Sequence, residues 1–145
     1  MDNLETLKQV ADTCQEVGAE RGIALTVTIL DAHALPVVLQ RAAGAGVLTL
    51  EMAERKAYTS GAIGRESGSI KDLIQPGQPL YSLTTSSSRL IAFGGGTQLT
   101  LDEETYGLGI SGGPSEIEDM EILAEAQFRL EDTEIRWAER WFSSR

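Results

Sequence analysis

The apolar positions at the start of the chain recur every three or four residues. From residue 3 to residue 21 this spacing predicts an amphipathic helix, which we expect to end at Gly22. Its apolar face comprises Leu4, Leu7, Val10, Ala11, Cys14, Val17 and Gly18. The period then changes to two over residues 23–31, where Leu25, Val27 and Ile29 alternate with threonines. This alternation predicts a half-buried strand.

A second strand is expected over residues 35–41, joined to the first by the short turn at residues 31–34. Pro36 suits the start of a strand or an edge strand, because proline donates no ladder hydrogen bond. A helix is predicted to follow, with Thr49 as its N-cap and its end near Ile63. Small side chains would let this helix lie close to a sheet or to another helix. They are Ala53, Ala57, Ser60, Gly61 and Gly64.

The second half of the chain predicts further short elements and one long helix. A short helix is expected near residues 67–74, followed by three strands at 89–93, 97–101 and 105–111. Ser115 and Glu118 have the spacing of a helix capping box. Because no Gly or Pro interrupts residues 115–142, we expect a last helix of about 25 residues or more. One face of this helix would carry Met120, Leu123, Leu130, Trp137 and Trp141.

The order of these elements, α-β-β-α-α-β-β-β-α, contains hairpins and no repeated βαβ units. It therefore predicts an α+β fold with an antiparallel sheet. A chain of 145 residues is expected to form a single domain over residues 1–145, with 114–145 as the long C-terminal helix.

Charge and composition narrow the classes of function. The net charge is −10, of which residues 102–145 contribute −8. Such acidity disfavours binding to nucleic acid and to anionic lipid surfaces. No signal peptide or membrane-spanning run is visible, and a lone cysteine forms no internal disulfide, so we expect a cytoplasmic protein. One His and one Cys, without metal-ligand spacing, predict no metal site.

Two glycine-rich segments are the most distinctive local feature. They are Phe93-Gly94-Gly95-Gly96 and Gly107-Leu108-Gly109-Ile110-Ser111-Gly112-Gly113. Their backbone N–H groups could face an anionic or carbonyl ligand, with Gly94, Gly95, Gly96, Ser111, Gly112 and Gly113 as a wall. Alternatively, the glycines permit tight turns that packing requires. Asp119 and Glu121, near the start of the last helix, are expected to favour the helix dipole.

Five segments together resemble the GlcG/HbpS family, which includes the C-terminal domain of PduO-type proteins and is often labelled a haem-degrading domain. They are Val27–Asp31, Leu39–Ala45, Ala53–Ser60, Phe93–Gly96 and Gly107–Gly113, in that order and spacing. The resemblance covers about residues 5–128. It implies a profilin-like α-β-α sandwich with a five-stranded antiparallel sheet, and homo-oligomers of two or more subunits. Some relatives bind haem, and others are linked to corrinoid metabolism.

Two cations are the first candidates for ligand binding. Arg41, at the end of a strand, could meet a carboxylate, or it could form a surface ion pair. Lys56 could anchor an anion, or act as an amine or general base if it is desolvated, or be an ordinary solvated helix lysine. The resemblance favours a functional role for Lys56.

Four further residues have both a functional and a structural interpretation. His33 could be an acid–base group or ligate haem iron, or simply be an exposed turn residue. Cys14 could be a haem thiolate but is more typical of a small buried apolar side chain. Tyr58 and Thr59 could line a cofactor pocket with their hydroxyls, or pack in a core or interface.

Three functions are consistent with these residues. The first is a ligand-binding accessory protein for haem or a corrinoid, with its pocket between the sheet and the second helix. The second is a small isomerase, lyase or cyclase acting on a carbonyl or carboxylate metabolite, with Lys56 or His33 moving the proton. The absence of a histidine from the first helix favours this second function over haem binding. The third is a structural oligomer subunit whose contact surface includes Trp137, Trp141 and Phe142.

Overall fold

The computed structural model describes residues 2–139. The elements in chain order are α1 (Asn3–Glu20), β1 (Thr26–Leu30), β2 (Pro36–Arg41), α2 (Val47–Ile63), η1 (Ser67–Leu73), α3 (Leu83–Ser86), β3 (Gly96–Leu101), β4 (Glu104–Ser111), α4 (Glu116–Arg129) and β5 (Arg136–Trp137). The helix at the N-terminus, the first hairpin and the strands β3 and β4 confirm the elements predicted from periodicity.

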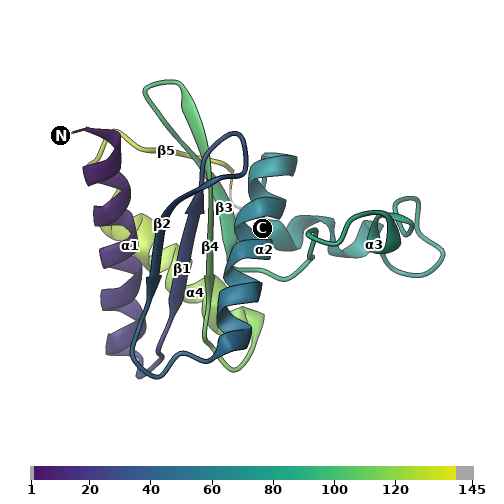
Figure 1. The fold of residues 1–145 in the computed structure, drawn as a ribbon, viewed down its shortest axis with the longest axis horizontal. Coiled ribbons are helices and arrows are strands. Elements are labelled where there is room, and N and C mark those ends of the chain that lie inside the picture. The colour runs from purple at the N-terminus through teal and green to yellow at the C-terminus, as the bar shows by residue number, and fades with distance from the viewer. Residues whose placement is uncertain (1, 140–145) are drawn as a thin grey trace.

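The strands form one antiparallel sheet in the order β2-β1-β4-β3-β5. Helices α1 and α4 lie on one face of this sheet, and α2 lies on the other (Figure 1). The α+β class, the five antiparallel strands and the α-β-α layering are therefore confirmed. The segment from η1 through α3 extends away from the sheet beyond α2 (Figure 1).

The main core lies between the sheet and the pair α1 and α4. It includes Leu7, Val10, Cys14 and Val17 from α1, Ile122, Leu123 and Ala126 from α4, and Val27, Ile29, Leu99, Leu108 and Ile110 from the strands. All five residues of β1 are buried, whereas the alternation predicted a half-buried strand. The threonine face is covered because α2 packs over it, with the Thr26 and Thr49 hydroxyls 2.8 Å apart.

Helix α2 lies unusually close to β4, and glycine makes this contact possible. A Cβ atom at Gly107 would be 2.1 Å from Ala57 O, and one at Gly109 would be 2.0 Å from Ala53 O. Real Cβ atoms do not approach backbone oxygens so closely, so only glycine fits at these positions. The small side chains of α2 and the glycines of β4 are thus complementary.

The start of α2 differs from the prediction. The N-cap is Gly46, and Thr49 lies inside the first turn, where its hydroxyl donates to Gly46 O at 2.6 Å. The Thr49 hydroxyl thus bonds to a backbone carbonyl group three residues earlier, which is common for a threonine inside a helix. The predicted cap was therefore placed three residues too late.

The strand predicted at residues 89–93 is wrong. Its backbone groups bond to side chains instead of a neighbouring strand: Ile91 N–H donates to Thr59 Oγ1 at 2.9 Å, and Ser67 Oγ donates to Phe93 O at 2.5 Å. These bonds satisfy backbone groups of residues 89–93, which form an irregular connection that leads to β3.

The long C-terminal helix over 114–145 is also wrong. Helix α4 ends at Arg129, and Leu130 is its C-cap. Ile135 then enters the main core, and β5 pairs with the outer edge of β3 through Leu99↔Trp137 and Thr100↔Arg136. This short strand, rather than residues 89–93, completes the sheet. The expected contact residues Trp141 and Phe142 lie outside the described residues.

Within residues 2–139, no helix combines the length and the apolarity that a bilayer crossing requires.

Candidate functional site

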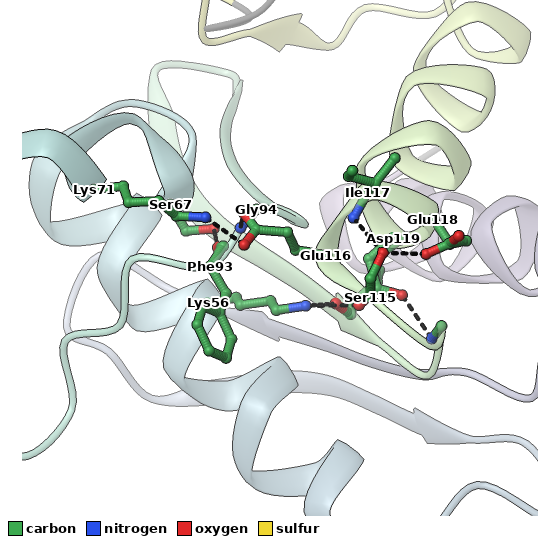
Figure 2. A network of polar contacts seen from close by, with 12 residues as sticks. Lys56, Ser67, Lys71, Phe93, Gly94, Ser115, Glu116, Ile117, Glu118 and Asp119 are labelled. Carbon is green, nitrogen blue, oxygen red and sulfur yellow. Dashed lines mark hydrogen bonds and ion pairs between the residues drawn. The ribbon is translucent and has the colours of Figure 1, made fainter.

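Lys56 is a buried cation at the centre of the contact between α2, β4 and α4. Its side chain is 2% exposed, and its Nζ donates to Asp119 Oδ2 at 2.8 Å and to Ile110 O at 2.9 Å. Figure 2 shows the lysine reaching from α2 toward the first turn of α4. The solvated helix lysine considered from the sequence is therefore excluded.

The start of α4 holds the carboxylate in place. Ser115 is the N-cap, and its hydroxyl accepts from Ile117 N–H at 3.2 Å, while Gly113 N–H donates to Asp119 Oδ1 at 2.8 Å. Gly95 lies against the pair with a φ of +116°, and a Cβ there would be 2.9 Å from Lys56 Nζ. The glycine before β3 is thus required by both the backbone and the ion pair.

A second ion pair lies beside the first. Lys71 Nζ, from η1, bonds to Glu116 Oε2, and Gly94 N–H donates to Glu116 Oε1 at 3.1 Å (Figure 2). Burial opposes ionisation of Glu116, but the hydrogen bonds from Lys71 and Gly94 outweigh it and lower its pKa. The two cations and two carboxylates of this network cancel in formal charge.

Burial also lowers the pKa of Lys56, because the ammonium has lost most of its solvation. The charge of Asp119 and its hydrogen bond act in the opposite direction but do not reverse the shift. The neutral amine is therefore more accessible here than at an exposed lysine.

An open cleft of about 270 Å³ borders this network. It is lined by Leu48, Thr49, Met52, Lys56, Phe93, Ser111, Gly112, Gly113, Pro114, Ser115, Glu116 and Asp119. We call it the Lys56 cleft. Leu48 is 61% exposed and Phe93 is 48% exposed, so the cleft has apolar side chains on its walls and a buried amine at its base. Such a combination suits an apolar ligand with a few polar groups.

Comparison with protein families identifies this architecture. A model described as "Haem degrading protein HbpS-like" matches residues 3–127. The chain belongs to the HbpS-like family. The family resemblance seen in the sequence is confirmed.

Individual relatives agree with this assignment. The corrinoid adenosyltransferase PduO of Salmonella typhimurium is 34% identical over 122 residues, which are 83% of this chain and 36% of that protein. This HbpS-like chain thus spans about a third of that enzyme. An uncharacterized 15.0 kDa protein of Citrobacter freundii is 30% identical over 84% of this chain and 86% of its own length. A crystal structure of a PduOC:Heme complex has a TM-score of 0.82 and 30% identity, covering 94% of this chain and 96% of that one.

The structure places His33 in a different cleft of this HbpS-like chain. That cleft has a volume of about 310 Å³ and includes His33, Ala57, Tyr58, Gly61 and Gly107. Lys56 is not among its lining residues, so the two predicted proton-transfer residues do not face a common space.

Several other predicted residues do not line the Lys56 cleft. Thr59 is buried and accepts the bond from Ile91, while Tyr58 faces the His33 cleft and stacks with the Arg89 guanidinium 4.1 Å from its ring centroid. Arg41 is exposed and donates to Ala45 O at 3.0 Å. These three residues therefore do not line the same cleft as Lys56, and their roles in binding stay predictions.

The glycine segments serve two different purposes. Gly94, Gly95 and Gly96 are buried beneath the network, where added Cβ atoms would meet Met120, Lys56 and Ser67. They pack closely there and do not line the Lys56 cleft, so the ligand wall at this segment stays a prediction. Ser111, Gly112 and Gly113 do line the Lys56 cleft, as that prediction requires. Their roles in binding remain predictions.

Sequence reasoning missed Asp119 and Met52 as site residues. Asp119 was assigned to the helix dipole alone, and its distance of 63 positions from Lys56 gave no local signal of a pair. Met52 lies one turn before Lys56 on α2, and this i, i+4 spacing could have placed it in the same cleft.

The residues that could hold a metal or haem iron are few. Across residues 2–139, no three His, Cys, Asp or Glu side chains gather in a metal-binding arrangement. Cys14 is fully buried, and desolvation raises the pKa of its thiol to about 12. Cys14 lies in the main core and lines neither cleft, which favours the small buried apolar side chain over the haem thiolate.

Proposed function

We propose that this chain is an accessory binding protein for a tetrapyrrole-class ligand, haem or a corrinoid, which enters the Lys56 cleft by one edge. The observation that carries the proposal is the pairing of exposed apolar side chains, Leu48 and Phe93, with a buried amine at the base of one cleft. The family assignment and the relative solved as a heme complex support the ligand class.

The chemistry of the cleft fits such a ligand in part. A volume of about 270 Å³ takes one edge of a macrocycle, and the exposed Val47, Leu48 and Phe93 offer apolar surface to the remainder. Met52 lines the cleft, and a methionine thioether is an established haem ligand in proteins. Arg41 pairs in the sheet with Thr26, and the Thr26 hydroxyl contacts the hydroxyl of Thr49, which lines the cleft. The exposed Arg41 guanidinium could therefore reach an acidic substituent of the ligand.

The test is a titration of the purified protein with haem and, separately, with hydroxocobalamin, followed by absorbance. Leu48→Asp is the central variant, because Leu48 is exposed and an acidic residue is favourable in the first turn of a helix. We expect saturable binding that Leu48→Asp weakens at least tenfold. The matched control is Leu35→Asp, at a residue 59% exposed in the first hairpin, which should bind like the unmodified protein.

His33→Ala separates the two clefts in the same assay. Binding in the Lys56 cleft predicts that this variant keeps its affinity. Absence of saturable binding to either macrocycle would overturn the proposal, as would loss of binding in His33→Ala with Leu48→Asp unaffected. Assembly into homo-oligomers and a cytoplasmic location stay predictions, which sedimentation velocity and cell fractionation test.

A second candidate is a small enzyme acting on a carbonyl metabolite. One observation favours it: the Lys56 amine has a lowered pKa and a carboxylate 2.8 Å away. A lysine and an acid so arranged can exchange a proton with a bound substrate.

A further inference from the structure

Lysine is scarce in this chain, and the buried cation is one of three. The sequence contains nine arginines but only Lys8, Lys56 and Lys71. A guanidinium makes the stronger buried ion pair and does not release its proton, whereas an amine does release it when desolvated. Within residues 2–139 Lys56 is the most buried cation, and the choice of lysine there suits chemistry at the nitrogen better than ion pairing alone.

The two hydrogen bonds of Lys56 use only two of the three N–H donors of its ammonium group. An ammonium has three donors, and Lys56 Nζ donates to Asp119 and Ile110. Among the described residues no third acceptor contacts it, and the side chain borders the open cleft. One of the three N–H donors of the ammonium is thus left without a partner among the described residues.

Ser111 is a second polar group without a partner at the same place. Its side chain lies on the face of β4 that α2 covers, 8% exposed, and lines the Lys56 cleft. No hydrogen bond joins its hydroxyl to another described residue. The hydroxyl oxygen itself is accessible from the cleft, so it is free to bond to a ligand atom there.

The charges of the cleft indicate which ligand group fits. Lys56 is neutralised by Asp119, and Lys71 by Glu116, so an added carboxylate would meet two carboxylates already present. A neutral carbonyl group meets no such repulsion. It can accept from the Ser111 hydroxyl through its oxygen while its carbon faces the amine.

We propose that Lys56 forms a Schiff base with an aldehyde or ketone bound in this cleft, with Asp119 exchanging the proton and Ser111 binding the carbonyl oxygen. This activity rests on the second candidate function above, an enzyme acting on a carbonyl metabolite, and does not depend on tetrapyrrole binding. Asp119 first takes a proton from the ammonium, and the nitrogen lone pair then forms the new C–N bond as the carbonyl π electrons move to oxygen.

The rest of the step balances without a further reagent. The nitrogen of the adduct transfers a proton to the oxygen, which gives a carbinolamine. The proton held by Asp119 then passes to the hydroxyl group, the C–O bond breaks, and water leaves. The product is an iminium cation beside the Asp119 carboxylate, so the sum is ammonium plus carbonyl to iminium plus water. An iminium acidifies the neighbouring C–H bond, which is useful for isomerisation or carbon–carbon bond cleavage.

Reductive trapping of the iminium with cyanoborohydride tests this directly in the full chain. The protein is incubated at pH 8 with propanal, a neutral aldehyde, and sodium cyanoborohydride, and alkylation of each lysine is followed by peptide mass spectrometry. We expect Lys56 to react at least tenfold faster than the exposed Lys8, which is the internal control. Faster reaction at Lys8 than at Lys56 in the folded protein would overturn the proposal.

Two variants sharpen the result. Ser111→Ala should slow alkylation of Lys56 several-fold and leave Lys8 unchanged; equal rates at Lys56 in both proteins would overturn the role of Ser111. Lys56→Arg should abolish the fast reaction, with circular dichroism as the check on folding. The internal comparison with Lys8 needs no variant, so it decides the proposal even if Lys56→Arg does not fold. If Lys56 is not alkylated faster than Lys8, the Schiff-base proposal fails, and the result of the macrocycle titration still decides the binding proposal on its own.

Discussion

The buried pair Lys56–Asp119 should show strong energetic coupling. The two side chains are 2% and 4% exposed, and the Nζ–Oδ2 distance is 2.8 Å. Removing one partner leaves the other charge buried, which typically costs about 3–5 kcal/mol of the free energy of unfolding. In Lys56→Met, Asp119 keeps only the bond from Gly113 N–H, and in Asp119→Leu the ammonium keeps only Ile110 O.

The double variant Lys56→Met/Asp119→Leu removes both charges together. Because paired buried charges can often be replaced by apolar groups at little net cost, we expect it to lose about 2 kcal/mol or less. It should therefore be more stable than either single variant. The lost acceptor for Gly113 N–H accounts for the remaining cost.

Urea unfolding at pH 7, followed by circular dichroism, gives the free energies of unfolding for all four proteins. The interaction energy is the difference between the double loss and the sum of the single losses. Additivity within about 0.5 kcal/mol would refute the reasoning, because the two charges would then not depend on one another.

Three further predictions concern packing and the thiol. Gly109→Ala should cost at least about 3 kcal/mol of the free energy of unfolding because its Cβ would overlap the α2 backbone. In the same urea assay Gly61→Ala should stabilise the protein by up to about 1 kcal/mol, because Gly61 is helical and its added Cβ would make an ordinary contact, 3.5 Å from Gly107 Cα. Burial raises the pKa of the Cys14 thiol from about 9 to about 12. The thiol's contribution to the free energy of unfolding is therefore fully present below pH 9 and is lost as the pH rises toward 12. Cys14→Ala should flatten this fall in stability between about pH 9 and 11, and an unchanged slope would contradict the assignment. Ile135→Ala should cost about 2–4 kcal/mol by unfolding, while the exposed Ile117→Ala should stay within about 0.5 kcal/mol; equal effects would argue against the packing of Ile135.

The elements that the sequence predicted well depend on local patterns. The helix over α1 and the strands β1, β2, β3 and β4 have regular apolar spacing with turn residues between them. The Asp31 carboxylate, for example, accepts from the N–H groups of His33 and Leu35 and fixes the first hairpin turn within five residues. Such signals are complete in a short window of sequence.

The elements that were predicted wrongly depend on distant partners. Residues 130–137 contain no helix-breaking glycine or proline, yet the open edge of β3 and the core position of Ile135 draw them into β5. Residues 89–93 have a strand-like composition, but Thr59 and Ser67 satisfy their backbone instead. In both cases tertiary contacts override local propensity.

The candidate site shows the same division. Lys56 and the segment Ser111–Gly113 were identified because their motifs are local, and both line the Lys56 cleft. Lys56 and His33 line different clefts, which the sequence could not reveal because it does not show which face of α2 borders each cleft. Asp119 became recognisable only when α4 was seen to begin against Gly95 and Lys56.

The most direct measurement of the central claim is hydrogen–deuterium exchange of the protein with and without saturating haem. Occupancy of the Lys56 cleft predicts slower exchange at residues 47–52 and 111–117, with residues 31–34 and 57–62 unchanged. Slower exchange confined to residues 31–34 and 57–62 would place the ligand in the His33 cleft and contradict the account.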